Sequence, residues 1–239
     1  MPACAAIAAP YTEDFETFTT GGAAFGAENC WTGSGGTYYW ESAPGTDTGS
    51  GGTGPDPTIT TGNYFYTEAS NGASGDTTDL ISPLVDLTAL TAPALTFNYH
   101  MFGGQMGTLD VLVNGTTNVW TLSGEQQTSA TAPWELAVID LSAYVGQTIS
   151  ITIRGTSAGT FEGDISIDNV SFTEFPACAA PNIITNSFLL LLLLLPIFFF
   201  FRSTTTTTTT TTTITTTISS SSSNTTTMTN RVQQQQHWH

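Results

Sequence analysis

Hydrophobic and polar residues alternate with a period of two along several stretches of the first 175 residues, and this pattern predicts half-buried β-strands. The clearest stretches are residues 94–101, 108–113 and 148–154. Asn114 and Gly115 follow the second stretch, and this dipeptide is typical of a type I′ hairpin turn because both positions need positive φ. Before residue 182 no long stretch carries the apolar stripe of a helix. The pattern predicts an all-β fold of two antiparallel sheets packed face to face.

The stretch "GDISIDNVSF", residues 163–172, breaks this alternation. Ile165 and Ile167 occupy one face of a strand, but the apolar positions then resume out of step, after Asp168 and Asn169. Asp and Asn are poor strand formers. The break therefore indicates either a plain β-bulge or a place where a carboxylate faces a cation.

Composition changes sharply near residue 182, where a sequence rich in Gly, Thr, Ser and aromatic residues gives way to single-residue runs. We interpret the chain as a linker, one globular domain, a second linker, a short apolar segment and a low-complexity Thr/Ser/Gln tail. The bounds of these five parts are residues 1–10, 11–175, 176–187, 188–202 and 203–239.

The apolar run from Phe188 to Phe201 is shorter than the ~20 residues that cross a bilayer, and Pro196 interrupts it. This run is interpreted as a membrane anchor, as a buried core helix or as a repetitive nucleotide tract read out of frame. The homopolymer runs favour the third interpretation, in which the tail is disordered or non-native. The first ten residues lack the charged and long apolar regions of a signal peptide. We therefore expect a fragment of a larger protein.

Charge excludes one class of partner. The chain has three Arg and no Lys against 19 Asp and Glu, which gives a net charge of −16 and a pI near 4.1. Nucleic acid is not expected as a partner, because phosphate binding depends on clustered Lys and Arg. All 19 acids and a single Arg lie before residue 175, so the domain carries 1 − 19 = −18. Such a charge favours solubility, tolerance of high salt and binding of divalent cations.

The three cysteines are Cys4, Cys30 and Cys178, and the first and last lie in identical "PAC" triplets at the two borders of the domain. The repeat suggests that a similar linker precedes each module of a longer array. Cys4 with Cys30 is then the more natural disulfide. The two other pairings and three free thiols remain open.

Two patterns that resemble catalytic or nucleotide-binding motifs are better explained as loops. "GSGGTG" (49–54) is followed by two prolines that forbid the helix a dinucleotide site needs. "GTSAG" (155–159) continues into a strand, whereas a nucleophile elbow turns into a helix. The domain has only one histidine, His100, and it lies within a predicted strand. We do not expect an enzyme.

Aromatic residues are dense in the first third of the chain, and they form either the core or a platform on which sugar rings stack. They are Trp31, Tyr38, Tyr39, Trp40, Tyr64 and Tyr66.

Nine segments in this order together resemble a MAM domain, the extracellular module of meprins, neuropilins and receptor tyrosine phosphatases that also occurs in large secreted bacterial proteins. They are "DFETF" (14–18), "CWTG" (30–33), "YYWE" (38–41), "GPDPT" (54–58), "GNYFYTEAS" (62–70), "DLISPLVDL" (79–87), "LTFNYHMFGGQMGTLDVLV" (95–113), "WELAVIDLSAYVG" (134–146) and "ISITIRGTSAGTFEGDISIDNVSF" (149–172).

The resemblance implies a jelly-roll β-sandwich and a disulfide between Cys4 and Cys30. Animal MAM domains have a second cysteine pair, which is missing here, and this favours a bacterial-type surface or secreted protein. The implied function is non-catalytic adhesion at a cell surface, through a protein partner, self-association or a glycan. The alternative is an accessory domain of a secreted hydrolase, such as a peptidase, whose catalytic part lies outside this chain. Contact with a membrane is expected only through the C-terminal segment.

The resemblance also supports a structural calcium ion at the break in residues 163–172. In a jelly roll the first and last strands are neighbours, so Glu16 is expected beside Asp168, with the loop of Asp56 and Thr58 closing over them and Asp164 contributing a further carboxylate. Without a cation, carboxylates gathered in this way repel each other and at least one pKa rises. The alternative is that both aspartates of the strand are solvated edge residues.

Overall fold

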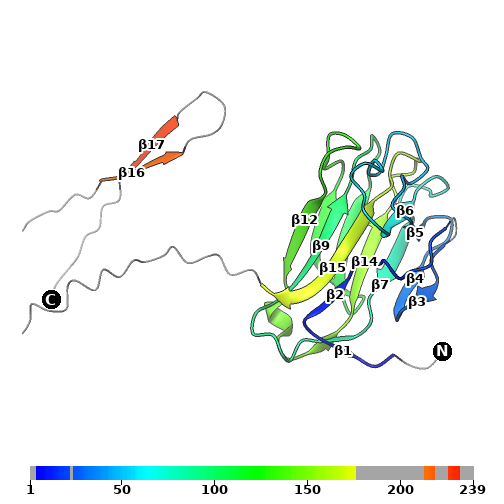
Figure 1. The fold of residues 1–239 in the computed structure, drawn as a ribbon, viewed down its shortest axis with the longest axis horizontal. Helices are drawn as coiled ribbons and strands as arrows, with labels where there is room; N and C mark the ends of the chain where they lie inside the picture. Colours follow the sequence, from blue (N-terminus) through cyan, green and yellow to red (C-terminus); the bar gives the residue numbers. More distant parts are fainter. Residues whose placement is uncertain (1–3, 22–23, 176–212, 219–225, 232–239) are drawn as a thin grey trace, which may run out of the picture. The chain divides into compact units, whose positions relative to one another are not determined.

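The computed structural model describes residues 4–21, 24–175, 213–218 and 226–231. Contacts divide the chain into two units, Met1–Asn182 and Ile183–His239. The first unit is a β-sandwich with jelly-roll architecture (Figure 1). The sequence-based prediction of an all-β fold is confirmed.

Two larger sheets form the sandwich. One has the order β12-β9-β15-β6-β5, with β2 also paired to β15, and the other has the order β11-β10-β14-β7-β4-β3. A small third sheet has the order β1-β8-β13. Their strands are β1 Ile7–Ala8, β2 Tyr11–Glu13, β3 Ala27–Glu28, β4 Trp31–Ser34, β5 Tyr39–Ala43, β6 Tyr64–Glu68, β7 Thr77–Ile81, β8 Val85–Asp86, β9 Pro93–His100, β10 Thr108–Val113, β11 Thr117–Ser123, β12 Glu135–Asp140, β13 Thr148–Ile149, β14 Ile151–Thr156 and β15 Ser166–Glu174.

The alternating stretches of the sequence are strands with one buried face, as predicted. The alternating residues of β9, β10 and β14 face the core between the sheets. Asn114 and Gly115 have φ of 50° and 70° and connect β10 to β11, as the hairpin signal requires. Residues 148–154, which we expected to form one strand, are divided between β13 and β14, and these two strands belong to different sheets.

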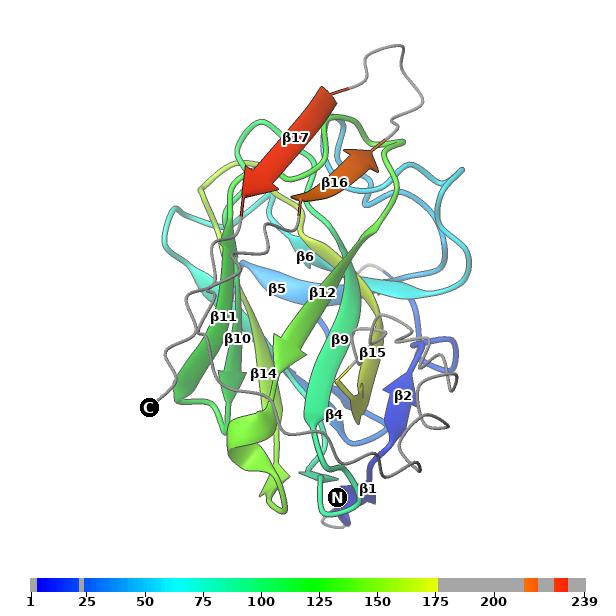
Figure 2. The same ribbon diagram turned by 90° about the vertical axis from the view of Figure 1, so that its left-hand side faces the viewer.

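Edge-to-face aromatic pairs connect the two sheets within the core. Phe15 packs against Phe65 at a centroid distance of 4.8 Å and against Trp31 at 5.4 Å, and Phe18 packs against Phe65 at 5.5 Å. Phe65 lies on β6, whereas Trp31 lies on β4 of the opposite sheet, so the two phenylalanines of "DFETF" connect the sheets. Figure 2 shows β10, β11 and β14 on one side of the sandwich and β9, β12 and β15 on the other.

Residues 1–10, which the sequence analysis assigned to a linker, contribute to the domain. Ile7 and Ala8 form β1, which pairs in parallel with β8, and Ala9 is buried. The sulfurs of Cys4 and Cys30 form a disulfide, which joins this segment to the turn between β3 and β4. A two-residue strand is too short to produce a detectable alternation, so the linker assignment is corrected here for residues 4–10.

The second unit contains a two-stranded antiparallel sheet formed by β16 Thr213–Ile218 and β17 Thr226–Arg231. These residues belong to the low-complexity tail, and their β-branched Thr and Ile suit a strand. The expectation of a disordered or non-native tail stays a prediction. The expected linker and apolar segment, residues 176–202, lie outside the described residues. Within the part of the chain that the structure describes, no helix is long and apolar enough to span a membrane.

The first prediction concerns the independence of the domain. A chain that ends at residue 181 should unfold cooperatively, with a melting temperature within a few degrees of the full chain, because the hydrophobic core lies within the first unit. Calorimetry of both forms measures this. Aggregation of the truncated chain while the full chain folds would show that the tail is part of the structure.

A second prediction concerns the disulfide. Replacing Cys4 and Cys30 together by Ser should lower the free energy of unfolding by about 3 kcal/mol. The reason is that the disulfide, which links residues 26 positions apart, no longer restricts the conformations of the unfolded chain. Urea unfolding measures the change. Cys178→Ser is the control and should leave the stability unchanged. Equal stability of the double variant and the parent chain would contradict the prediction.

Candidate functional site

A β-bulge lies where β15 changes its pairing partner. Ser166 and Ile167 pair with β6, whereas Val170 to Phe172 pair with β2. Between these two segments the register with β9 shifts, and Asn169 has a φ of 54°. Its amide donates a hydrogen bond to Asp168 Oδ1 at 2.6 Å. The bulge predicted from the broken alternation is confirmed.

The carboxylates of Glu16 and Asp14 act electrostatically on Asp168 at this bulge, and we call Asp168 with Glu16 the bulge site. β2 ends at Glu13, so the chain leaving it passes directly beside Asp168. Burial raises the pKa of Asp168 to about 7; the Asn169 amide offsets part of this rise, and the carboxylates of Glu16 and Asp14 add to it. Glu16 thus lies near enough to act on the pKa of Asp168, but burial, and not the repulsion between carboxylates expected from the sequence, is the main cause of the rise. Asp14 was missed, although it stands two residues from Glu16.

The backbone around Gly62 holds the carboxylate of Glu16. Glu16 Oε1 accepts a hydrogen bond from the Asn63 amide at 3.1 Å, and the Asn63 side chain donates to the carbonyl of Glu16 at 3.2 Å. Gly62 has a φ of 80°, and a Cβ added there would lie 1.6 Å from Glu16 Oε1. Only glycine therefore fits at this position.

Asp164 lies in different surroundings. It is four residues before Asp168, roughly 13 Å away in extended chain at about 3.3 Å per residue. Asp164 is fully buried, and its Oδ1 accepts a hydrogen bond from the Ala69 amide at 2.9 Å. Burial raises its pKa to about 7, the Thr48 hydroxyl and the Ala69 amide lower it, and Glu68 raises it further.

Asp56 and Thr58 form a third, separate group. Asp56 Oδ1 accepts hydrogen bonds from the Thr58 amide at 2.8 Å and hydroxyl at 2.6 Å, which lower the pKa of Asp56. The Asp56 amide donates to the carbonyl of Ala130 at 2.8 Å, which attaches this turn to the loop before β12. The short-range side-chain turn explains why an Asp and a Thr occur at this spacing.

The five oxygen ligands expected from sequence are thus divided among three places. Only Glu16 and Asp168 come together. Among the described residues no three His, Cys, Asp or Glu side chains form a group that could hold a metal ion. Any ion at the bulge site would therefore need backbone carbonyls or water in addition to two carboxylates.

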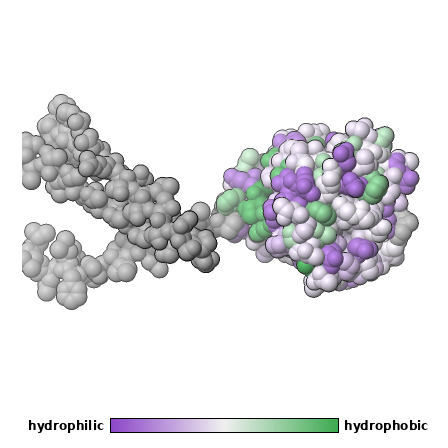
Figure 3. Space-filling view, turned by 90° about the horizontal axis from the view of Figure 1, so that it is seen from above, coloured by the Kyte–Doolittle hydropathy of each residue, from purple (hydrophilic) through white to green (hydrophobic). Residues whose placement is uncertain are grey.

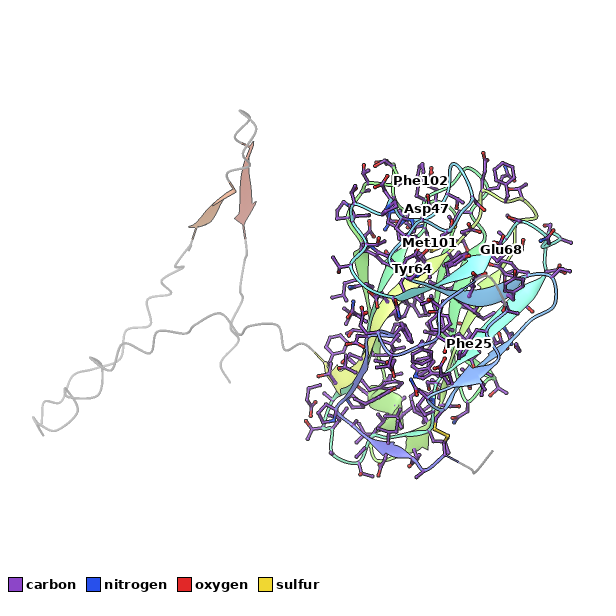
Figure 4. All side chains as sticks on the ribbon, turned by 45° about the vertical axis from the view of Figure 1, so that its right-hand side comes forward. Phe25, Asp47, Tyr64, Glu68, Met101 and Phe102 are labelled. Carbon is purple, nitrogen blue, oxygen red and sulfur yellow. A yellow bond between two sulfur atoms is a disulfide. The ribbon has the colours of Figure 1, made fainter. Side chains whose placement is uncertain are left out.

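Five of the six aromatic residues singled out in the first third are buried, and Tyr39 on β5 is partly exposed, so they do not form an exposed platform for sugars. Trp31, Tyr38, Trp40 and Tyr64 are at most 1% exposed. Tyr64 and Tyr66 form a small cluster apart from the main core, and Trp134 packs against it. Tyr64 also donates a hydrogen bond to the carbonyl of Thr46 in the loop 44–63 at 2.5 Å. Figure 4 shows Tyr64, Asp47 and Met101 toward the same end of the sandwich.

The surface at the loop end of the sandwich is mostly polar. Figure 3 shows this end mostly in pale colours of intermediate hydropathy, with separate hydrophilic and apolar patches. Among the described residues the most exposed large apolar side chain is that of Leu136, at 60%. It lies on the edge strand β12, and the partly exposed Val138 follows two residues further on. These two side chains occupy the outer face of a strand whose second edge is unpaired in the described sheet.

Comparison with known proteins identifies the class of this domain. The family model of the MAM domain, meprin/A5/mu, matches residues 14–179, and the chain therefore belongs to this family. It is 37% identical over 118 residues to MAM domain-containing glycosylphosphatidylinositol anchor protein 1 of Gallus gallus, covering 46% of this chain and 12% of that protein. It is 30% identical over 131 residues to Neuropilin-1 of Xenopus laevis, covering 51% of this chain and 14% of that protein.

A third relative is MAM domain-containing protein 2 of Homo sapiens, which is 37% identical over 133 residues. The match covers 52% of this chain and 18% of that protein. The chain thus spans less than a fifth of the length of these three relatives. Among solved structures, the K1 cleaved adhesin domain of Lys-gingipain from Porphyromonas gingivalis W83 is similar, with a TM-score of 0.48, 17% identity and coverage of 69% of this chain and 98% of that domain.

His100 is a buried neutral side chain. It is fully buried on β9 beside Trp134, at a ring distance of 5.8 Å. Burial lowers the pKa of His100 to about 4, and the nearby backbone of Ala132 offsets part of this effect without forming a hydrogen bond to either ring nitrogen. The side chain is therefore placed as a packed core residue, the reading favoured by its position in a strand.

A third prediction follows from His100. Below pH 6.5 the unfolded chain binds a proton on this residue that the folded chain does not, so the wild type loses stability as the pH falls toward 4. Between pH 7 and pH 4.5 the free energy of unfolding should fall by roughly 2 to 3 kcal/mol more in the wild type than in His100→Leu. Urea unfolding at both pH values measures the difference. Parallel pH profiles would contradict the buried neutral state.

Proposed function

We propose that this MAM domain is a non-catalytic adhesion module of a larger extracellular or cell-surface protein, and that a structural calcium ion stabilises it. The family match over residues 14–179 is the observation that carries the proposal. The Cys4–Cys30 disulfide supports an oxidising, extracellular compartment, because disulfides persist there and are rare in the cytosol. The short matched share of each relative supports a module within a longer chain.

The side chains that could act in hydrolysis are poorly placed for it, which supports the non-catalytic part of the proposal. His100 is buried, and Ser157 accepts a hydrogen bond from the Gly159 amide within its own loop at 2.9 Å. A serine nucleophile needs a base within hydrogen-bond reach. As an accessory domain of a secreted hydrolase, the module would have the same binding role.

The partner is proposed to be a protein, either a second copy or another surface protein. Leu136 and Val138 on the edge strand β12 provide an exposed apolar contact, which suits a protein interface better than a sugar. The buried aromatic residues are not available to stack on a glycan. With a charge of 1 − 19 = −18 on the domain, contact between two copies would be weak at low ionic strength and stronger with salt or divalent cations.

The calcium ion of this proposal would be held at the bulge site by Glu16 and Asp168. The raised pKa of Asp168, caused by burial and by the two neighbouring carboxylates, supports a fit to a cation. The bulge also releases backbone carbonyls from strand pairing, and calcium accepts such carbonyls as ligands. Its role would be structural: it would connect the chain after β2 to the central strand β15.

A fourth prediction tests adhesion. Beads coated with the full chain should aggregate with one another, or bind beads that carry extracellular matrix proteins, and Leu136→Asp should reduce the binding at least tenfold because it places a charge at the proposed contact. Leu84→Asp is the matched control, because Leu84 is also exposed, at 47%, and lies away from β12. If the chain binds no protein-coated beads but does bind polysaccharide-coated beads, the partner is a glycan and the proposal of a protein partner is contradicted.

A fifth prediction tests the calcium ion at the bulge site. At a calcium concentration of 100 times the dissociation constant, the ion should add about 2.7 kcal/mol to the free energy of unfolding, which is a rise of roughly 5 to 10 °C in melting temperature. Asp168→Asn should lose this increment, and Asp110→Asn, on the opposite sheet, should retain it. Calorimetry with calcium and then with a chelator measures the shift. Identical rises in melting temperature with calcium in the wild type, Asp168→Asn and Asp110→Asn would show that no ion binds at the bulge site.

A further inference from the structure

A second carboxylate, away from the bulge site, is buried without a complete set of partners. Asp164 is fully buried where the loop 44–63 meets the end of β6. Its amide donates a hydrogen bond to the Thr53 hydroxyl at 3.0 Å, and its Oδ1 accepts one from the Ala69 amide at 2.9 Å. Its Oδ2 has no hydrogen-bond partner among the described residues. A buried carboxylate oxygen in this state is costly unless a proton or a cation satisfies it.

Other oxygen atoms converge on the same carboxylate. The Thr48 hydroxyl, on a residue only 4% exposed, also lacks a hydrogen-bond partner among the described residues. Thr48 and Ser50 lie close enough to lower the pKa of Asp164, and Glu68 lies close enough to raise it. We call Thr48, Ser50, Glu68 and Asp164 the Asp164 cluster. It joins a glycine-rich loop, the end of β6 and the segment before β15; Figure 4 labels Glu68.

The domain has no cationic side chain of its own to neutralise Asp164. The chain contains no lysine. Arg154 makes a two-point contact with Asp79 on the opposite sheet, at 2.6 and 2.9 Å, and is fully engaged there. His100 is buried, and burial lowers its pKa to about 4, so it is neutral at physiological pH. A counter-charge for Asp164 at neutral pH must therefore come from outside the domain.

We propose that the Asp164 cluster is a second cation site, distinct from the bulge site, and that its ion is calcium. All its side-chain ligands are oxygen, with two carboxylates and two hydroxyls, which suits a hard cation and not zinc or copper. An irregular loop that can also supply backbone carbonyls suits the six to eight ligands of calcium better than the strict octahedron of magnesium. This inference does not depend on an adhesive function.

An ion at the Asp164 cluster would fasten the loop 44–63 to the sheet. Thr48 and Ser50 belong to this loop, whereas Glu68 and Asp164 belong to the sheet side of the cluster. The same loop accepts a hydrogen bond from Tyr64 of β6 through the Thr46 carbonyl, and its turn at Asp56 contacts Ala130. Loss of the ion should therefore free the loop and expose Tyr64 while the core of the sandwich remains folded.

The competing explanation is that Asp164 carries a proton and donates a hydrogen bond of its own. Burial, which raises its pKa to about 7, is compatible with that state in the absence of a metal ion. The two explanations differ in sign with pH. A protonated buried Asp164 loses stability as the pH rises through 7, whereas a calcium-bound carboxylate is retained at high pH and releases its ion on acidification.

The test is the number of calcium ions bound by the full chain at pH 8, measured by isothermal titration with calcium alone. The expected stoichiometry is two for the wild type and for Asp110→Asn, one for Asp164→Asn, and one for Asp168→Asn. Thr48→Val is a second variant that preserves side-chain shape, and it should weaken the second ion at least tenfold even if Asp164→Asn folds poorly. Hydrogen exchange of residues 44–56 should slow at least tenfold on adding calcium to the wild type and to Asp168→Asn, but not to Asp164→Asn.

Each outcome decides between the sites. Two ions in Asp164→Asn would overturn the proposal for the Asp164 cluster. One ion in the wild type that only Asp168→Asn removes would leave the bulge site intact and overturn this inference. One ion that only Asp164→Asn removes would support the cluster and contradict the bulge site. No ion in the wild type, with stability that falls from pH 5 to pH 8 except in Asp164→Asn, would establish the protonated acid instead.

Discussion

The exchange of pairing partners along β15 is the constraint on which the acidic sites of this domain depend. One edge of β15 follows β9 throughout, while the other edge pairs first with β6 and then with β2. A strand cannot pair with both at one position, so a bulge separates the two segments. The bulge turns Asp168 toward the chain that leaves β2, and the segment before β15 carries Asp164 beneath the loop 44–63. The topology of one strand thus places two carboxylates where burial raises both pKa values.

The charge of the domain gives these carboxylates a second consequence. In most proteins a buried acid finds a lysine or an arginine, but here Arg154 is committed to Asp79 and lysine is absent. The fold therefore satisfies most of its acids with backbone amides and hydroxyls, as at Asp56, Asp140 and Glu174. Asp164 is incompletely satisfied in this way, because its Oδ2 has no hydrogen-bond partner among the described residues. The cations proposed above would supply the missing positive charge there and at Asp168.

Much of the fold could be predicted from the sequence, because its strands have one buried face. The alternation in β9 and β10, the Asn114–Gly115 turn and the break before Asn169 were all read correctly. The strand β1 was not, since a two-residue pairing with β8 leaves no periodic signal.

Less of the candidate site could be predicted from the sequence. The order of strands in a jelly roll predicted that Glu16 lies beside Asp168, and the Glu16 carboxylate does lie near enough to raise the pKa of Asp168. The structure does not place Asp56 and Asp164 beside Glu16 and Asp168, as the sequence had suggested. Alternation predicts which face of a sheet a residue occupies, but not how far along the strand a loop reaches. The Asp164 cluster was missed for the same reason: Thr48 and Ser50 lie in an irregular glycine-rich loop, where only the folded structure shows which side chains turn inward.

The most direct measurement is anomalous diffraction from crystals of the full chain grown with calcium and compared with crystals grown with a chelator. Two peaks that depend on calcium are expected. One lies between Glu16 and Asp168, and the other lies within coordination distance of Asp164 Oδ2 and the Thr48 hydroxyl. Well-ordered density for both aspartates with no anomalous peak beside either one would contradict the claim that cations complete the acidic sites of this domain.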